Sequence, residues 1–473
     1  MSHFKIKLVS ILLLFSFLSE AQIELKNQIL DFSTLLPIES ASIYVKNTTI
    51  GTVSNADGKF TLMVDKQFER DTLVVSSIGY KSYKIPVDEF VNSVEVYLEE
   101  DVASLDEIVL VAETRPKTGN DIVKRALREL DNNLPDSSYL QKGFLRHKER
   151  NSKEFKWLIE SAITLYDSSY ISKSKKHLKI NVDEVRKSYD LRNVDSMFTY
   201  TSYLKAKERR YDLKPEDLNR RDVKTSQLIK AIKWNDTRVN GLESLLKGKL
   251  NLLRNINEKR ALFGTEILNQ HQFTLDTILV DDGRKIYKIK IGKSKDYVNL
   301  ETKGIYNDGY QAEGWLYIYW DNYAIKKIEY QLNAASAAQK SRSKRLLGST
   351  TNHKLTLAYK DYNGKMYPNY IYYETPKLVN VGLKYKGKVD EKELARYNKE
   401  ERYYYTVQEI LFSEIITDQE KIQSTLNQNW DPDIFSQKPY NKSFWDNYNT
   451  LLESEEDEKL IEDLTRRSSL YKY

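Results

Sequence analysis

The chain has 473 residues and no cysteine, so it is long enough for about two to four domains and cannot contain disulfide bonds. Charged residues make up 30% and apolar residues 40%, which indicates globular domains over the greater part of the length. The net charge of +6 is small for this length and indicates no particular partner.

Residues 1–21 have the pattern of a secretory signal peptide. A short basic start, "HFKIK", precedes the apolar run "LVSILLLFSFL" and the small-residue site "SEA", so we expect cleavage after Ala21. The apolar run is short for a membrane span, and no later stretch approaches the necessary length. We therefore expect an exported chain without a transmembrane helix after cleavage, in the periplasm or associated with the outer membrane, and no nucleic-acid partner. Because no cysteine follows the signal region, a lipid anchor on cysteine is excluded.

Residues 22–101 are expected to form a sandwich of short antiparallel strands. The stretches "ASIYVKN" and "KFTLMV" alternate between apolar and polar residues, and "DTLVVSSIGY", "YKIPV" and "SVEVYL" follow at regular spacing. In the first stretch Ile43 and Val45 share a face, and in the second Phe60, Leu62 and Val64 do.

The stretch "IGTVSNADGKFTL", residues 50–62, contains the Asn-x-Asp-Gly pattern that also occurs in calcium loops. Placing Gly58 at the glycine position of such a loop puts Val53 at its first position and Val64 at its last. Both are apolar, so the bidentate carboxylate that calcium requires is missing. Asn55, Asp57 and Gly58 also suit a tight turn, and we predict a hairpin here.

With these residues in place, "LPIESASIYVKNTTIGTVSNADGKFTLMV" and "DTLVVSSIGYKSYKIPV" resemble the carboxypeptidase regulatory-like domain of Bacteroidota. The resemblance covers about residues 23–100 and implies a small prealbumin-like β-sandwich that is not itself catalytic. The segment "LDEIVLVAE", residues 105–113, is similar to the one that follows this domain in TonB-dependent receptors and related envelope proteins. The plug and barrel of a receptor would need a longer chain.

Residues 102–135 are expected to form a linker and a short amphipathic helix that ends at "NNLPDSS". Asn120 or Asp121 can cap the start of this helix. Its apolar residues recur at helical spacing: Ile122, Val123, Ala126, Leu127 and Leu130.

Residues 136–440 are expected to form an α+β domain with long antiparallel strands. The stretches "SYLQKGFLRHKERN" and "KWLIESAITLYDSSY" indicate a hairpin, and two helices near Pro215 and Gly241 indicate a helical insert over residues 183–262. Strands return with a "DDGR" turn at 281–284 and continue through "EGWLYIYWDNYAIKKIEYQL", "HKLTLAYKDYNGKMYPNYIYYETP", "NVGLKYKGKV" and "RYYYTVQEILFSEII".

The order of these stretches, over about residues 120–335, is similar to that of uncharacterised Bacteroidota envelope proteins that carry the regulatory domain. The "GWLYIYWDNYAIKKIE" element also resembles a strand pair of lipoprotein-carrier-like half-barrels, in which a curved sheet wraps a helix and holds an acyl chain. Residues 441–473 are expected to be an acidic helix or mobile tail with a solvated charged face.

Known catalytic patterns are missing from the sequence. None of His147, His177, His271 and His353 begins an H-x-x-E or H-E-x-x-H pair, and no G-x-S-x-G elbow occurs. The run "GLKYKGKV" approaches a phosphate loop through Gly382, Gly387 and Lys388, but Val389 replaces the required Ser or Thr. We predict no catalytic, cofactor-binding or metal-binding residues, and hence no enzyme.

Two surface features remain open to interpretation. Residues 141–260 hold 29 Lys and Arg against 16 Asp and Glu, a net of +13, which fits either a surface for anionic lipid or an acidic partner, or ordinary solvated faces. The aromatic residues on the predicted strands suit a core edge, a glycan platform or a membrane interface: Trp315, Tyr317, Tyr319, Tyr403 and Tyr405.

The sequence thus predicts a mainly β, α+β envelope protein, with an N-terminal prealbumin-like antiparallel sandwich and a curved antiparallel sheet with inserted helices. Its expected role is non-enzymatic binding or scaffolding at the outer membrane, with an outer-membrane protein or lipid as partner. One alternative is a periplasmic carrier of an apolar ligand such as lipid, which an apolar cavity of several hundred Å³ inside the sheet would favour and a filled interior would oppose. Another is a hydrolase with an unrecognised site.

Overall fold

The computed structural model describes residues 22–101, 115–151, 155–170, 172, 177–189, 194–248, 250–257, 267–293, 297–298, 309–380 and 401–465. The expected signal peptide, the segment 105–113 and the near match to a phosphate loop at 382–389 lie outside the described residues. Among the described helices, none combines the length and the apolar character needed to cross a lipid bilayer.

Residues 22–98 form a sandwich of two small sheets. The first has the order β4-β1-β7 and the second β3-β2-β5-β6, and one pair, β1 with β7, is parallel. The core between them includes the alternating residues Ile43, Val45, Phe60, Leu62 and Val64, as predicted. The strands are β1 (Gln22–Asp31), β2 (Ser42–Val45), β3 (Gly51–Val53), β4 (Lys59–Asp65), β5 (Thr72–Ser76), β6 (Tyr83–Pro86) and β7 (Val96–Leu98).

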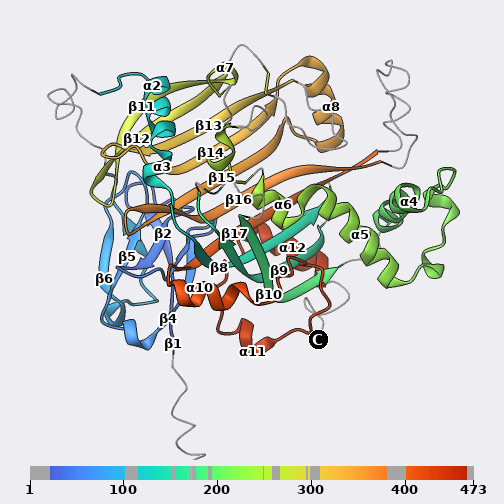
Figure 1. Ribbon diagram of the computed structural model, residues 1–473, viewed down its shortest axis with the longest axis horizontal. Coiled ribbons are helices and arrows are strands. Elements are labelled where there is room, and N and C mark those ends of the chain that lie inside the picture. Colours follow the sequence, from blue (N-terminus) through green and yellow to red (C-terminus); the bar gives the residue numbers. More distant parts are fainter. Residues whose placement is uncertain are drawn as a thin grey trace, which may run out of the picture.

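The rest of the chain is built on one curved antiparallel sheet of ten strands (Figure 1). Its order is β10-β9-β8-β17-β16-β15-β14-β13-β12-β11, so only the β8–β17 neighbours are distant in sequence. The predicted hairpins are confirmed, and Gly283 and Gly364 adopt positive φ in two of their turns. The strands are β8 (Tyr139–Arg150), β9 (Phe155–Asp167), β10 (Leu178–Tyr189), β11 (His271–Asp281), β12 (Arg284–Lys293), β13 (Tyr310–Tyr319), β14 (Ile325–Ala334), β15 (Thr351–Tyr362), β16 (Lys365–Asn380) and β17 (Glu401–Ile416).

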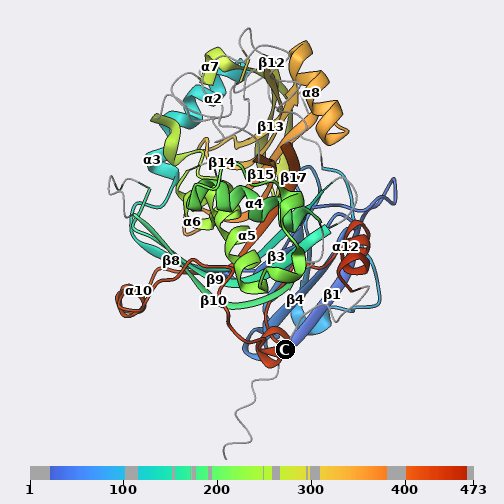
Figure 2. The same ribbon diagram turned by 90° about the vertical axis from the view of Figure 1, so that its right-hand side faces the viewer.

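Helices cover the concave face of this sheet, and the sandwich lies against its outer face (Figure 2). The large core joins α2, α3 and the segment 242–253 to the sheet. The helices are α2 (Gly119–Arg128), α3 (Leu130–Asn133), α4 (Val194–Glu208), α5 (Thr225–Asn240), α6 (Leu242–Lys247), α7 (Ile267–Gln270), α8 (Ala337–Leu347), α10 (Gln419–Leu426), α11 (Lys442–Trp445) and α12 (Glu455–Thr465), with 3₁₀ turns at 66–68, 87–89, 215–217, 220–222 and 254–257.

The structure corrects two predicted details near the helices. Residues 183–189 continue strand β10 through its pairing with β9, so the helical insert begins at Val194 and not at 183. Helix α2 is capped by Thr118, whose hydroxyl accepts from the Asp121 backbone N–H at 3.2 Å. Asn120 instead accepts from the backbone N–H of Phe273 at 3.0 Å, which fixes the helix to β11.

The acidic C-terminal helix is not a solvated tail over its described length. In α12, Leu460 and Leu464 are buried against Leu158 of β9, although acidic residues surround them in sequence. Asp457 is also buried, and its carboxylate accepts from Lys148 of β8 at 2.7 Å. Because these three residues share one helical face, the helix packs on the outer face of the sheet.

Candidate functional site

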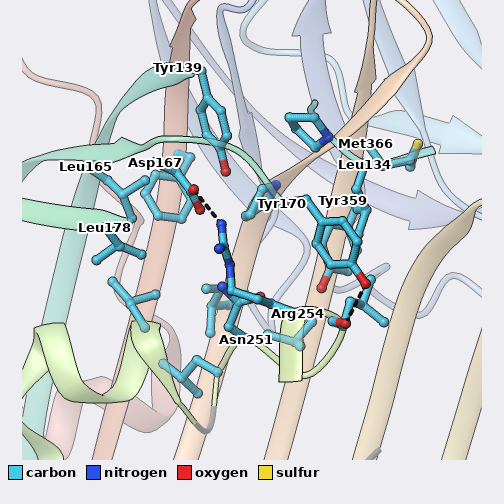
Figure 3. Close-up of a pocket in the computed structure, with 18 of the residues that line it drawn as sticks. Leu134, Tyr139, Leu165, Asp167, Tyr170, Leu178, Asn251, Arg254, Tyr359 and Met366 are labelled. Carbon is cyan, nitrogen blue, oxygen red and sulfur yellow. Dashed lines mark hydrogen bonds and ion pairs between the residues drawn. The ribbon is translucent and has the colours of Figure 1, made fainter. Parts of the chain in front are cut away.

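The concave face of the sheet encloses a small apolar pocket (Figure 3). Strand residues such as Leu165, Leu178 and Phe412 form one side, and Leu246 and Leu253 of the helical insert form the other. The cavity volume is about 60 Å³, which is the space of about two water molecules. Leucines from the insert therefore fill the sheet interior in this structure.

The polar groups of this pocket are already satisfied. Arg254 points at Asp167 (Figure 3), with 2.6 Å between Nη2 and Oδ1, and both side chains are almost fully buried. Burial raises the pKa of Tyr139 well above its usual value and that of Tyr170 to about 12, so both hydroxyls stay protonated. The pocket has an apolar wall and a neutralised ion pair, and it offers no ionised nucleophile.

A network of buried charges lies further along the same face, where α5 meets the sheet. The ammonium of Lys377 on β16 contacts Glu149 on β8 and lies 3.2 Å from the Oδ1 atom of Asp236 on α5. The same Asp236 oxygen lies 3.3 Å from Nε2 of His147, whose Nδ1 faces the Gln408 amide at 3.0 Å. The charged residues of this network are at most 4% exposed. Ion pairs that are shielded from solvent therefore join two strands and a helix.

One ammonium group cannot neutralise two buried carboxylates, so the pKa values of the two carboxylates move in opposite directions. The pKa of Asp236 is lowered, because His147 and Lys377 together outweigh its desolvation. Burial raises the pKa of Glu149 to about 7, since Lys377 is shared and the nearby charge of Asp236 repels a second anion. The two carboxylates also raise the pKa of Lys377 despite its burial. The network is therefore best described as Asp236 anionic, Lys377 cationic and Glu149 largely neutral below pH 7.

This network resembles an acid–base site in its residue types but not in its access. Trp157 covers the Lys377 ammonium, with 4.9 Å from Nζ to the ring centre, and the carboxylates point at the cation rather than into the pocket. A substrate would have to separate α5 from the sheet to reach them. We interpret the network as a connection between the helical insert and the sheet.

A recess larger than the pocket on the concave face lies between the sandwich and the outer face of the sheet. This cleft has a volume of about 450 Å³, within the range of ligand sites, and it adjoins a smaller recess of about 160 Å³. The sandwich contributes Ser76 and Tyr80, and the sheet contributes Asp281, Tyr317 and Lys326. Residues of both domains thus line this cleft. It lies outside the sheet and is partly polar, unlike the apolar cavity inside the sheet that a carrier would need.

The two walls of the cleft are held together by a few polar contacts. Asp282, in the β11–β12 turn, pairs with Lys84 of β6 at 2.7 Å and accepts from the Tyr44 hydroxyl at 3.2 Å. The backbone N–H of Gly79 donates to the carbonyl of Val280 at 2.7 Å. These contacts fix the relative position of the two domains at one end of the cleft.

A loop of the sandwich, residues 32–36, forms one rim of the cleft and exposes three large apolar side chains. Phe32, Leu35 and Leu36 are 59%, 62% and 64% exposed. The loop is held in place by Asp31, whose Oδ1 atom accepts from the backbone N–H of Thr34 at 2.7 Å. Asp31 is buried and also accepts from the Tyr80 hydroxyl at 2.9 Å, so the apolar side chains are presented on a well-anchored turn.

Comparison with known proteins identifies the N-terminal part. The family described as CarboxypepD_reg-like domain matches residues 26–110. The chain carries a CarboxypepD_reg-like domain. A stretch of 90 residues of the chain is 38% identical to the TonB-dependent receptor SusC of Bacteroides thetaiotaomicron, which covers 19% of this chain and 8% of the receptor. The chain thus spans only a small part of the length of that curated relative.

The solved structures that are similar to the chain are distant from it. A LolA superfamily protein from Nitrosomonas europaea covers 64% of this chain and 94% of its own, at 8% identity and a TM-score of 0.20. A DUF1329 family protein from Desulfovibrio piger covers 63% and 93%, at 10% identity and a TM-score of 0.20. At such scores neither likeness establishes a shared fold.

The predicted turn of the CarboxypepD_reg-like domain is confirmed, and it has a second use. Asn55 accepts from the backbone N–H groups of Asp57 and Lys59 at 3.0 and 2.9 Å. Its amide donates to the carbonyl of Glu453 at 3.0 Å, and Asp57 accepts from the backbone N–H of Glu455 at 2.8 Å. The residues that resembled a calcium loop therefore attach the domain to the C-terminal segment. Within the described part of the chain, no cluster of three or more His, Asp or Glu is arranged for a metal ion.

The other residues singled out in the sequence are dispersed over the fold. His271 faces the Tyr330 hydroxyl at 2.8 Å and His353 faces the Thr375 hydroxyl at 2.9 Å, so both are core histidines. Tyr319 is buried with its hydroxyl donating to Asp281, and Trp315 and Tyr317 lie on the outer face of β13.

Sequence reasoning missed the apolar loop and the buried charge network. The stretch "FSTLLP" fits no strand period, which was the available signal for the loop. The network joins residues that are far apart in sequence and follows no motif.

Proposed function

We propose that the chain is a non-enzymatic exported protein of the cell envelope that binds a partner protein at the outer membrane. The partner would dock at the cleft between the CarboxypepD_reg-like domain and the sheet, with the apolar loop 32–36 as its main contact. The exposure of Phe32, Leu35 and Leu36 on an anchored loop is the observation that carries this proposal. Three large apolar residues at one exposed turn favour burial in a complex.

The construction of the loop supports a binding role. Leu35 has a φ of 59°, a conformation that costs a residue other than glycine about 1–2 kcal/mol. The loop maintains this conformation through Asp31 and leaves the leucine side chain in solvent. A loop selected only for stability would place glycine or asparagine there, so the leucine contributes little to the isolated protein.

The setting is supported by the relative of this domain. The matching protein of Bacteroides thetaiotaomicron is named a TonB-dependent receptor, and the leader of this chain has the pattern of a signal peptide. We propose the periplasm or the outer membrane as its location, where a membrane-associated protein is available as partner.

The test is photo-crosslinking from the loop in the native envelope. A photoreactive amino acid at Leu36 should give one defined protein adduct, and the same probe at Tyr211, which is 46% exposed, should not. The variant Phe32→Ser/Leu35→Ser, with the probe still at Leu36, should lose at least about nine-tenths of that adduct, since interface anchors dominate affinity.

Two outcomes would overturn the proposal. Adducts of the same pattern from Leu36 and Tyr211 would show non-specific contact, and adducts with phospholipid alone would show that the loop faces a membrane. Circular dichroism of the double variant separates loss of binding from loss of fold.

Carriage of an apolar ligand is a second candidate, favoured by the leucine-rich wall of the pocket on the concave face. Its volume of about 60 Å³ is too small for an acyl chain, so a carrier would have to displace the segment 246–254. Lipid analysis of the protein purified from its own envelope tests this. Stoichiometric lipid would support carriage, and its absence together with an unchanged melting temperature on addition of fatty acid would exclude it.

A further inference from the structure

The outer face of strands β11 to β15 carries a broad hollow of about 970 Å³, on the side of the sheet opposite the helical insert. Strand register places one residue of each strand in a row across it. The row runs Thr274, Lys290, Trp315, Glu329 and Thr356. Neighbouring members of such a row are about 5 Å apart, so this row spans about 20 Å with the indole at its centre.

A second aromatic residue extends this surface along the strand. Tyr317 lies two residues from Trp315 on the same face of β13, at a spacing of about 7 Å. It also lines the cleft beside the CarboxypepD_reg-like domain. The hollow and the cleft are therefore neighbours on one face, and two aromatic side chains mark the path between them.

The ring of Trp315 is fixed from one side. The ammonium of Lys288 lies 4.2 Å from its centre, and the side chain is only partly buried. A cation over one face of an indole holds the ring in place, and a ligand can then contact the part of the ring that remains exposed. Amide and hydroxyl groups stand beside it, from Gln272, Gln331 and Thr274.

Some charged side chains of the hollow already have partners among the described residues, and others do not. Glu329 already pairs with Lys327 at 2.6 Å and accepts from the Tyr317 hydroxyl at 3.2 Å. By contrast, Lys290 and Lys354 are exposed, and the described part of the chain offers neither a carboxylate partner. The hollow is also lined by Glu313, whose carboxylate accepts from the Gln331 amide at 3.4 Å, and by the exposed Lys293. Three lysines, at 290, 293 and 354, against Glu313 leave the net charge available to a ligand positive.

We propose that this hollow binds an acidic oligosaccharide, with one sugar ring against Trp315 and sugar carboxylates at Lys290 and Lys354. The apolar face of a sugar ring matches the indole, and its hydroxyls match the amides and threonines around it. A lipid chain would require a continuous apolar lining, whereas the only large apolar side chain that this row presents to solvent is Trp315. This inference goes beyond the proposed docking of a protein partner and does not depend on it.

Calorimetric titration with a uronic-acid tetrasaccharide tests the proposal on the full mature chain. Trp315→Ala and the double variant Lys290→Gln/Lys354→Gln should each weaken binding at least about tenfold, and Trp315→Phe should stay within about threefold of the parent. A neutral glucose tetrasaccharide should bind at least about tenfold more weakly than the acidic one. Raising the salt concentration should weaken the acidic ligand more than the neutral one.

The chain offers matched controls. Trp430 is also partly exposed and has Lys179 over its ring at 5.7 Å, so Trp430→Ala tests a similar tryptophan elsewhere. Lys66→Gln/Lys117→Gln removes two exposed lysines outside the hollow. Both should leave affinity unchanged, as should Phe32→Ser/Leu35→Ser, which separates this site from the loop.

The proposal is overturned if millimolar acidic tetrasaccharide gives no binding heat, or if Trp315→Ala and the lysine pair bind as the parent does. Equal affinity for the neutral sugar would show that the lysines do not select an acidic ligand. Binding to anionic phospholipid vesicles but not to the tetrasaccharide would show that the ligand is a lipid and not an oligosaccharide. Trp315→Phe guards against misfolding, because it retains the packing of the ring.

Discussion

The Nζ atom of Lys377 lies 3.2 Å from the Oδ1 atom of Asp236, and neither side chain is in contact with solvent. Lys377 belongs to β16 and Asp236 to α5, so this ion pair joins the helical insert to the sheet. Removing one partner of a buried ion pair leaves the other charge buried and uncompensated. This costs far more than the loss of an exposed pair, because the desolvation of the remaining charge is not recovered.

Replacing Lys377 by methionine should therefore lower the free energy of unfolding by about 3–5 kcal/mol. Urea denaturation at pH 7.5 measures it. The control is Lys442→Met, which removes an ion pair of similar length, 2.6 Å to Asp446, between side chains that are both more than half exposed. That change should cost less than about 0.5 kcal/mol. Equal losses in the two variants would contradict a special role for the buried pair.

Glu149 should make the protein less stable as the pH rises from about 5 to 7. Burial raises its pKa from 4.5 in the unfolded chain to about 7, so the folded state binds the proton more tightly over this interval. Stability then falls with rising pH, by up to about 3 kcal/mol for a shift of this size.

Glu149→Gln keeps the shape of the protonated side chain and should remove this part of the pH dependence. The comparison needs urea denaturation of both proteins at pH 5 and pH 7.5. Asp236 acts in the opposite direction, since its lowered pKa favours the folded state above about pH 4, but it is ionised at both pH values and does not change the difference. A parent and variant with the same difference between the two pH values would disprove the assignment.

The hairpins of this fold were predictable because their signals are local. Asp282–Gly283 and Asn363–Gly364 stand between alternating stretches, and all four residues adopt the positive φ that such turns require. The turn at Gly58 is equally local, although there the glycine has positive φ and Asp57 does not. The conformation of each turn is determined by two residues and the strands beside them, and tertiary packing is compatible with it.

The burial of charge was not predictable from the same reasoning. Strand β8 contains "RHKE" at 146–149, and all four side chains are buried, two on each face. A strand covered on both faces normally consists of apolar residues, so this stretch indicates an exposed edge. Its partners, such as Asp236 and Asp457, come from segments about 90 and 310 residues away, and only the folded chain brings them together. The burial of α12 escaped prediction for the same reason.

Helix α12 should contribute to stability through one face only. Leu460 is fully buried against Leu158, and Leu460→Ala should cost about 2–4 kcal/mol. The neighbouring Ile461 is only partly buried, and Ile461→Ala should cost less than about 1 kcal/mol. Thermal unfolding of both variants makes the comparison. A mobile tail would instead give two small and similar effects.

Calcium should have no effect on the CarboxypepD_reg-like domain. Asn55 and Asp57 direct their oxygens at backbone N–H groups of the turn and of the C-terminal segment, and Val53 and Val64 take the positions where a calcium loop needs acids. Millimolar calcium or a chelator should leave the melting temperature within about 1 °C, since only binding to the folded state raises it. A rise that depends on calcium concentration and disappears in Asp57→Asn would reveal a site.

Gly58 should be the least replaceable of the turn glycines. Its φ is +72°, and an added Cβ would lie 2.4 Å from the carbonyl oxygen of Ile29 and 3.1 Å from Pro37. Gly364 has a similar φ of +77° with no atom within 4 Å of an added Cβ, so Gly364→Ala carries only the conformational cost of about 1–2 kcal/mol. Gly58→Ala adds the clash with a backbone atom that cannot rotate away. This should lower the free energy of unfolding by about 1–3 kcal/mol more than Gly364→Ala does. Urea denaturation of the two variants isolates the steric part, because the conformational part is common to both. Equal losses would mean that the β1 strand can move to accommodate a methyl group at the turn.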